Sequence, residues 1–517
     1  MNTPHILSQQ SATDLHPQDS FDYKSLENIN LEKCREVESD LIKELIVLEK
    51  ALLDPDFGRG PSTIGSELEI FLINNELSPS MVNTEICKHV DPNKFQTEIS
   101  RFCLEYNGPV LELNNQAFNN LTTEMQAELC ELRKFTKDKL NTNLAMIGIL
   151  PTLTTNDLGM DAFTPHWRYF AMDKIIRSMR KDHDFVLDIE GENSLFLKWY
   201  NTLLEGVNTS YQVHLRVNPQ DFNNYYNAAQ LIAPFVLSLS GNSPLLFGHQ
   251  LWEESRIAVF EQVVNNKSLH LGSLLEQDRV SFGRGWINNG AFGLLKEACE
   301  LFYPVFTKAN SKCSKDDSSA SSGPNLSYIA QHNSTIWPWN RAVYDKALGG
   351  HFRIEMRYLP AGPTIADMVA NTAFMIGLVK YFSNDMPNII SKMPFKYAQY
   401  NFCQAAQYGL KANCIWPCVQ SQKLKESPVT DLLADMIKFA GEGLHALGVT
   451  ELEIMSMQNI IQQRLESQIT GAIWQKTIYN KFINKKFPPD IALKEMFRLY
   501  LVKQDQGIPV ALWRFDT

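Results

Sequence analysis

The segment from Gly349 to Thr364, GGHFRIEMRYLPAGPT, constrains the fold most, because charged and apolar residues alternate along it. In an extended strand, successive side chains point to opposite faces of a sheet. Arg353, Glu355 and Arg357 therefore share one face, and the residues between them form an apolar face. Such a charged row is costly to bury without partners. The segment predicts either a solvated strand with a cross-strand ion pair or a strand lining a site for an anion and a divalent cation.

A second alternating segment runs from Ser62 to Asn74, where the even-numbered positions are mostly apolar. Glu67 and Glu69 then point the same way from one strand. Like charges at this spacing repel each other unless a cation lies beside them. The segment predicts either a solvent-facing strand edge or a pair of metal ligands.

A third strand is predicted from Asn208 to Asn218 by the same alternation. Its polar face carries Ser210, Gln212, His214 and Arg216. A single histidine on a strand is usually bonded to a neighbour inside the core. Four polar groups on one strand face favour a face that lines an active site.

Two further carboxylates lie near the turn at Asn107 and Gly108. Pro109–Asn114 predicts a strand that carries Glu112, and Glu105 lies just before the turn. We expect the strand-borne polar groups to face one concavity; they are Glu67, Glu69, Glu105, Glu112, His214, Arg353, Glu355 and Arg357. Oxygen-rich sites favour Mg²⁺ or Mn²⁺, and metal with arginine is typical of nucleoside triphosphate binding and phosphoryl transfer. The sequence lacks a phosphate-binding glycine loop of the Walker type, so metals would hold the phosphates.

Outside these strands the apolar spacing is mainly helical. The strand-rich part lies between an N-terminal leader and a helical C-terminal region. We expect helices over 30–53, 121–140, 164–180, 223–239 and 363–381, a helix-like run over 251–262, a central strand over 143–152 and a short strand over 185–189. The predicted domains are a loose leader over 1–30, a catalytic domain over 31–425 with a serine-rich flexible insertion at 311–323, and a helical region over 426–517 packed on the core.

Composition limits the classes of binding partner and the cellular compartment that we expect for this chain. The chain has 517 residues and a net charge of -10, and no cluster of lysine and arginine stands out, which argues against nucleic acid or an anionic membrane surface. The apolar run from Leu231 to Gly248 is broken by proline, glycine and asparagine, so no membrane span is predicted there. The nine cysteines are scattered, and no secretory signal is visible, so we expect free thiols in a cytoplasmic protein. Oligomeric state is left open.

The order of four short motifs resembles the glutamate–cysteine ligase family, whose wider relatives are carboxylate–amine ligases with the glutamine synthetase catalytic fold. The motifs are G-x-E-x-E at Gly65–Glu69, L-E-L at Leu111–Leu113, Q-V-H at Gln212–His214 and R-x-E-x-R at Arg353–Arg357. Further likeness extends the resemblance from about Thr63 to Gln475, in the segments GILPT (148–152), NSPLLFG (242–248), RYLPAGPTIADMVAN (357–371) and TGAIWQ (470–475).

The resemblance implies an α+β fold with a curved, mainly antiparallel sheet that forms an active-site funnel, helices outside it and a helical C-terminal layer. It implies that the metal ligands are Glu67, Glu69, Glu105, Glu112, His214 and Glu355. Arg357, beside Glu355, would face an acyl phosphate. The groups expected to contact the nucleotide are Arg353, Arg256 and Gln212.

The function implied is an ATP- and Mg²⁺-dependent ligase that activates a carboxylate, the γ-carboxylate of glutamate, and joins it to an amine through an acyl phosphate. Cysteine is one possible amine, and the sequence does not select among acceptors. Two alternatives remain open at this point: a phosphotransferase like the guanidino kinases, and a non-enzymatic regulatory protein that retains the fold.

Overall fold

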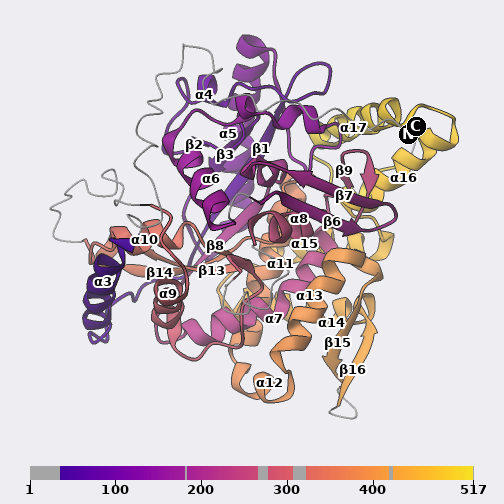
Figure 1. Cartoon of the computed structure of the whole chain (residues 1–517). Coiled ribbons are helices and arrows are strands. Elements are labelled where there is room, and N and C mark those ends of the chain that lie inside the picture. The colour runs from indigo at the N-terminus through magenta and orange to yellow at the C-terminus, as the bar shows by residue number, and fades with distance from the viewer. Residues whose placement is uncertain (1–34, 181–182, 266–277, 307–321, 419–422, 516–517) are drawn as a thin grey trace.

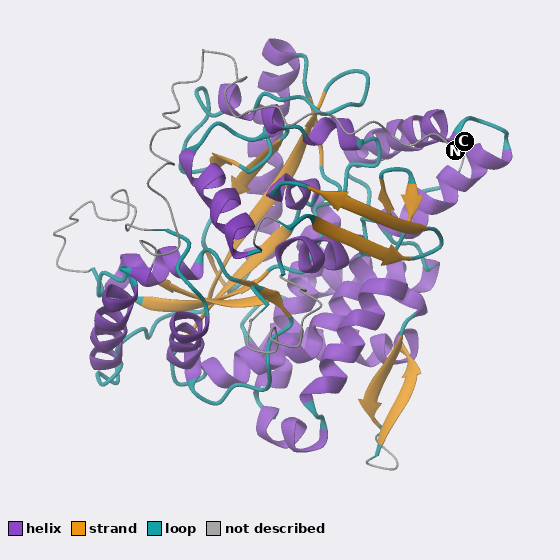
Figure 2. Cartoon of the chain, in the orientation of Figure 1, coloured by secondary structure: helices purple, strands orange, loops and turns teal. Residues whose placement is uncertain are grey.

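The computed structural model describes residues 35–180, 183–265, 278–306, 322–418 and 423–515. The predicted leader over 1–30 and most of the predicted insertion at 311–323 lie outside these residues. Helices and strands alternate irregularly along the rest of the chain (Figures 1 and 2). The architecture is that of an α+β protein.

The main sheet has eight strands, in the order β13-β14-β8-β1-β3-β2, with β4 and β5 also paired to β1. Every pairing in it is antiparallel. Its strands are β1 Thr63–Ile73, β2 Phe95–Thr97, β3 Cys103–Asn107, β4 Leu111–Glu112, β5 Asn143–Ala145, β8 Tyr211–Val217, β13 Asn340–Asp345 and β14 His351–Met356. The strands turn strongly from one edge to the other in Figure 2. The central strand β1 thus joins segments from both halves of the chain.

Within the described ranges, four two-stranded sheets lie outside the main one. They are β6 Phe185–Glu190 with β7 Ser194–Trp199, β9 Leu245–Leu246 with β10 His249–Gln250, β11 Val280–Ser281 with β12 Trp337–Pro338, and β15 Asn413–Pro417 with β16 Leu424–Pro428. The α-helices are α3 Glu38–Ala51, α4 Asn83–Ile86, α5 Ala117–Leu140, α6 Trp167–Met179, α7 Phe222–Ser240, α8 Ser255–Val264, α9 Gly290–Leu301, α10 Ser327–Asn333, α11 Ile365–Ser383, α12 Met386–Lys392, α13 Phe395–Tyr408, α14 Val429–Ala446, α15 Glu451–Ser467, α16 Gly471–Asn484 and α17 Pro489–Gln506.

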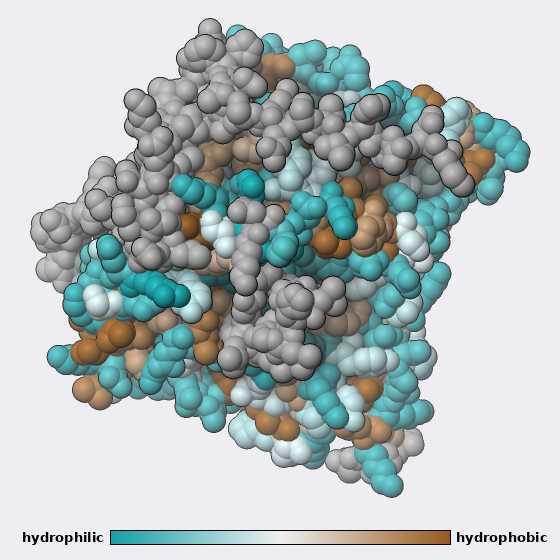
Figure 3. Space-filling view, in the orientation of Figure 1, coloured by the Kyte–Doolittle hydropathy of each residue, from teal (hydrophilic) through white to brown (hydrophobic). Residues whose placement is uncertain are grey.

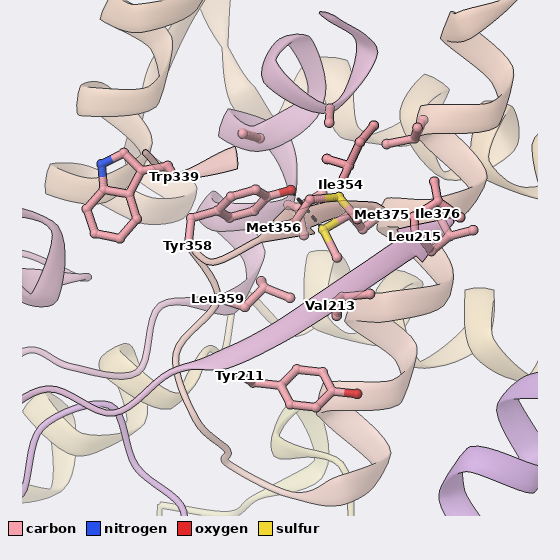
Figure 4. Close-up of a cluster of buried hydrophobic side chains, with 14 of the residues drawn as sticks. Tyr211, Val213, Leu215, Trp339, Ile354, Met356, Tyr358, Leu359, Met375 and Ile376 are labelled. Carbon is pink, nitrogen blue, oxygen red and sulfur yellow. Dashed lines mark hydrogen bonds between the residues drawn. The ribbon is translucent and has the colours of Figure 1, made fainter. Parts of the chain in front are cut away.

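One face of the main sheet is apolar and covered by helices. The side chains of Val213, Leu215, Ile354 and Met356 are at most 1% exposed and meet α11 in the cluster of Figure 4. Burying such side chains contributes roughly 1.5–3 kcal/mol each. The alternation therefore places the polar side chains of the same strands on the opposite face, which we call the site face.

The helix α11 is long and apolar enough to cross a membrane by length and composition alone. In this structure 78% of its apolar window is buried, and it packs against α7, α14 and α15. It is therefore a core helix here, and its uniform apolarity reflects burial on all sides.

The C-terminal helices α14 to α17 form a layer on the core (Figure 1). Arg464 of α15 pairs with Asp367 of α11 at 2.8 Å, and both are at most 1% exposed. Gln475 of α16 donates to the side chain of Asn242 at 2.9 Å. Asn242 in turn donates to the carbonyl of Ala361 at 2.7 Å, just after β14. The predicted α+β fold with a curved antiparallel sheet and a helical C-terminal layer is confirmed.

Two sequence expectations about strands were wrong. The central strand predicted over 143–152 is regular only at Asn143–Ala145, because side chains of α17 bond the backbone beyond it. Gln504 accepts from the amide of Met146 at 2.7 Å, and Tyr500 donates to its carbonyl at 2.8 Å. The strand predicted over Pro109–Asn114 is regular only at Leu111–Glu112; Glu105 does lie just before the turn, at the end of β3.

Candidate active site

Antiparallel register places the charged residues of four strands side by side on the site face. Glu355 of β14 lies opposite His214 of β8 and opposite Arg341 of β13. His214 lies opposite Gly65 of β1 on its other side. Gly65 has no side chain, and an added Cβ would meet only the His214 Cβ, at 3.9 Å. Across the sheet, Arg341, Glu355 and His214 therefore lie in one row, and the next position in the row is Gly65, which leaves space beside the histidine.

Glu67 and His214 form the contact at the middle of this face. The His214 Nε2 lies 3.0 Å from the Glu67 Oε1. His214 is 5% exposed, yet neither ring nitrogen makes a hydrogen bond of good geometry. Burial raises the pKa of Glu67, but the His214 ring and the Arg357 guanidinium outweigh it, so that pKa lies below its ordinary value. Glu67 is thus held as a carboxylate.

Glu355 is held between two arginines. Arg341 donates Nη2 and Nε to the Glu355 Oε2 at 2.8 and 3.2 Å, and Arg357 donates Nη1 to Oε1. Burial raises the pKa of the Glu355 carboxyl, but the charges of Arg341, Arg357 and His214 lower it far below its ordinary value. Glu355 is 1% exposed and ionised, and it joins the histidine to the arginines.

Further along β1, carboxylates crowd together without an equivalent number of cations. Oxygens of Glu69, Glu98 and Glu105 lie within 4.8 Å of one another. Burial and the Glu98 charge raise the pKa of Glu69 to about 7. Burial and neighbouring carboxylates raise the pKa of Glu105 well above its usual range. We call Glu69, Glu98 and Glu105 the acidic cluster. Its negative charges are not balanced by the nearby positive ones, as the raised pKa values indicate.

A fourth carboxylate, Glu205, lies in the short 3-10 helix Thr202–Val207, outside the strands of the main sheet. Burial, followed by the charges of Glu69 and Glu98, raises the pKa of Glu205 to about 8. Burial is the main cause, and the charges of Glu69 and Glu98 add to it.

Gln212 connects the acidic cluster to the arginines. Its Nε2 donates to the Glu69 Oε1 at 3.1 Å, and its Oε1 accepts from Arg357. The amide of Ser210 also donates to Glu69, at 2.6 Å. Gln212 is 2% exposed, so its amide is committed to these two side chains in this structure.

The remaining predicted residues lie at different distances from this centre. Arg353 lies on the site face and reaches Asp345 at 3.5 Å. Arg256 is 3% exposed and is bonded to Glu254 at 2.7 Å and to the carbonyl of Tyr358 at 2.8 Å. Glu112 is exposed at the far end of β1, opposite Thr63. The structure thus brings together Glu67, Glu69, Glu105, Gln212, His214, Glu355 and Arg357, with Arg353 next along its strand. Glu112 lies apart at the end of β1, whereas Arg256 of α8 is close enough for its charge to lower the pKa of Glu69.

Sequence reasoning missed Arg341, Glu98 and Glu205. Arg341 shares one face of β13 with Val343 and Asp345, so this strand carries only an interrupted form of the charged row that marked the Arg353 strand. Glu98 follows β2 and alternates with its exposed Gln96, so a signal existed there too. Glu205 lies in a 3-10 helix, where no periodicity marks it.

In the described part of the chain, one cavity lies away from this face and another borders it. The first, of about 930 Å³, lies between α3 and α9 and is lined by apolar residues such as Leu45 and Phe292 together with charged ones such as Glu49 and Lys296. Figure 3 shows brown, apolar residues at the lower left, where α3 lies in Figure 1. The other, of about 300 Å³, borders Arg341 and the glycine-rich loop around Gly285.

Comparison with protein families gives one match, over residues 63–472, which includes every residue of the site face discussed above. The match covers most of the chain, and it makes the protein a ligase of the carboxylate–amine class. The chain belongs to the family described as Glutamate-cysteine ligase family 2 (GCS2). The predicted family membership is confirmed.

The chain is also similar to solved structures, although only distantly. A glutamate–cysteine ligase from Francisella tularensis in complex with AMP is 13% identical, with a TM-score of 0.46 over 89% of this chain and 96% of that chain. A bifunctional glutathione synthetase from Pasteurella multocida is 9% identical, with a TM-score of 0.44 over 89% of this chain and 54% of that one. No curated protein matches the chain.

Proposed function

We propose that this ligase uses ATP and Mg²⁺ or Mn²⁺ to join the γ-carboxylate of glutamate to an amine through an acyl phosphate. The observation that carries the proposal is the position of Glu355. It lies opposite His214 in the sheet register and is bonded to Arg341 and Arg357. One short piece of sheet therefore combines groups that bind a divalent cation with groups that bind an anion.

The residues present fit a divalent metal. The His214 Nδ1 is buried without a hydrogen-bond partner, its Nε2 contacts only the Glu67 carboxylate at 3.0 Å, and the acidic cluster concentrates like charges. A hard cation would relieve both, and carboxylate and imidazole ligands suit Mg²⁺ or Mn²⁺. The residues that would hold metal are Glu67, His214 and Glu355 on one side and Glu69, Glu98 and Glu105 on the other. When bound, the metal supplies neutralisation of phosphate charge.

The protein side chains would then act on charge and position. Arg357, fixed by Glu355 and Gln212, would stabilise negative charge on the substrate carboxylate as the γ-phosphoryl group is transferred to it. Arg353 would contact the phosphates of the nucleotide. The amine nitrogen then forms the bond to the acyl carbon, the acyl–phosphate bond breaks, and phosphate leaves with release of the amine proton.

A phosphate-release assay with Mg-ATP, glutamate and a panel of amines that includes cysteine tests the proposal. Glu355→Gln is assayed in parallel, with Glu131→Gln on the exposed side of α5 as the matched control. Amine-dependent release that is lost in Glu355→Gln and kept in the control supports the ligase and identifies its acceptor. ATP:ADP exchange on a guanidino compound without amide formation would show a phosphotransferase. ATP binding without turnover for any amine would contradict the enzyme.

We further propose that the ligase acts in the cytoplasm and that residues 31–425 and 426–517 are its catalytic and helical regions. The described cysteines support the first point, because all of them are free thiols; they are Cys87, Cys103, Cys130, Cys299, Cys403, Cys414 and Cys418. Fractionation of cells that express a tagged chain tests the location.

A further inference from the structure

Two arginines face each other at the end of the site face away from the acidic cluster. Arg216 of β8 lies directly opposite Arg353 of β14. Like charges in this position repel, because directly opposed residues have Cβ atoms only about 4.5–5.5 Å apart. Arg216 is only 5% exposed, so water does little to screen it. The pair is costly unless negative charge lies close to it.

The residues that the structure describes supply little of that negative charge. Asp345 lies 3.5 Å from Arg353. Arg216 donates Nη2 to the carbonyl of Arg59 at 2.9 Å, which is a neutral acceptor. Burial lowers the pKa of Arg216, and Asp345 only partly offsets this. The Nε atoms of both Arg216 and Arg353 are buried without a hydrogen-bond partner.

A glycine-containing loop holds Arg216 in place. The backbone amide of Gly60 donates to the side chain of Asn218 at 3.0 Å, which brings the loop against β8. A Cβ added at Gly60 would lie 2.3 Å from the Arg216 Nη2. The backbone therefore rests directly on the guanidinium, and only glycine at this position leaves the arginine where it is.

We propose that Arg216 and Arg353 form a binding site for a diphosphate group, and that in the reaction this group is the non-transferred part of ATP. The second half of this statement rests on the proposed function. Arg216 follows His214 by two residues, a distance of about 6.6 Å along the strand. A nucleotide whose γ-phosphate lies at the row of His214 and Glu355 would thus place its inner phosphates beside the two arginines.

The experiment measures binding of ATP, ADP, AMP and inorganic pyrophosphate to the full chain by calorimetry, with Mn²⁺ binding measured separately. Arg216→Met removes the positive charge of the guanidinium. Gly60→Ala keeps that charge but pushes the Arg216 guanidinium aside. The fold should tolerate Gly60→Ala, because the displaced atoms are the end of a flexible side chain. The controls are Arg498→Met on the exposed part of α17 and Gly285→Ala, where an added Cβ meets nothing within 4 Å.

We expect both site variants to weaken ATP, ADP and pyrophosphate binding at least tenfold, with AMP and Mn²⁺ binding and both controls unchanged. Wild-type affinity for all three diphosphate-containing ligands in both site variants would overturn the diphosphate site while leaving the ligase proposal intact. Pyrophosphate binding that depends on Arg216, in a chain that binds no ATP, would support the anion site and contradict the proposed function. Equal loss of AMP and Mn²⁺ binding would show that Arg216 has only a structural role.

Discussion

Arg341 of β13 donates two nitrogens to a single oxygen of Glu355 on β14, at 2.8 and 3.2 Å. Arg341 is further fixed by a bond from Nη1 to the carbonyl of Asn333 at 3.2 Å. Glu355 is therefore positioned from the edge strand of the sheet, through a residue that the motif R-x-E-x-R does not contain.

We expect Arg341→Met to lower the free energy of unfolding by about 3 kcal/mol, because it leaves the buried Glu355 carboxylate with one arginine fewer. Urea denaturation measures the change. The double variant Arg341→Met with Glu355→Leu should recover part of the loss, since no unpaired carboxylate remains. Strictly additive losses would show that the two side chains are not coupled.

Arg256 is predicted to matter for stability more than for nucleotide binding. Its bonds to Glu254 and to the Tyr358 carbonyl are buried. Arg256→Met therefore leaves the Glu254 carboxylate in the core without its cationic partner. We expect a loss of about 3–5 kcal/mol in unfolding free energy, with ATP affinity unchanged in the folded fraction. A tenfold loss of ATP affinity at wild-type stability would instead support the phosphate contact predicted from the sequence.

Glu98 is predicted to contribute to metal binding although no motif includes it. Its carboxylate lies with those of Glu69 and Glu105, and each offers an oxygen within 4.8 Å of the others. We expect Glu98→Gln to weaken Mn²⁺ binding roughly tenfold, in the range typical of groups that support a metal site. Titration calorimetry measures this, and Glu131→Gln should bind Mn²⁺ like the wild type.

The stability of the metal-free protein should fall as pH rises. The pKa of Glu69 is raised from 4.5 to about 7 and that of Glu205 to about 8, by burial first and by neighbouring carboxylates second. Between these values and 4.5 the folded chain keeps protons that the unfolded chain has released. Their stabilising contribution is therefore complete below about pH 4.5 and is lost as pH rises through 7 to 8.

Melting temperatures from pH 5 to 9, in chelator and in Mn²⁺, check this prediction. Because metal binds the ionised carboxylates, Mn²⁺ should raise the melting temperature more at pH 8 than at pH 6. A metal-free melting temperature that stays constant or rises over this range would contradict it.

The contact between α16 and the loop after α7 should be intolerant of any added atom. A Cβ at Gly471 would lie 2.0 Å from the Asn242 Oδ1. Asn242 is fully buried and bonded to Gln475, Ala361 and Tyr500, so it cannot move aside. We expect Gly471→Ala to cost about 1–3 kcal/mol, as overpacking does. Chemical denaturation measures the loss, and Gly285→Ala should match the wild type.

Strand alternation was enough to predict much of the site. The pattern of Glu67 with Glu69, and of Arg353 with Glu355 and Arg357, puts these side chains on one face of a strand whatever lies around it, because the side-chain period of a strand is two. The motif order was enough to predict the family, and the family match confirms it. The helices were predictable because their apolar spacing persists over many residues.

Other elements depended on neighbours that no local pattern specifies. The stretch after β5 looks like a central strand, but its backbone is bonded by Gln504 and Tyr500 from the far end of the chain. Glu205 feels the charges of Glu69 and Glu98 although it lies in a 3-10 helix far along the chain from both. In the same way, Arg256 is held in the core by Glu254, two residues before it, and by a distant carbonyl.

Which side chains share a face follows from the amino-acid sequence alone, because alternation is a local property of the extended backbone. Which strands lie next to one another depends on tertiary packing, and so does the pairing of Glu355 with His214 and Arg341 and of Arg216 with Arg353. Pairing between distant strands is set by the burial of their common apolar face against α7 and α11. The sequence therefore predicts which charged side chains share a strand face, whereas their partners on other strands depend on how the apolar faces pack.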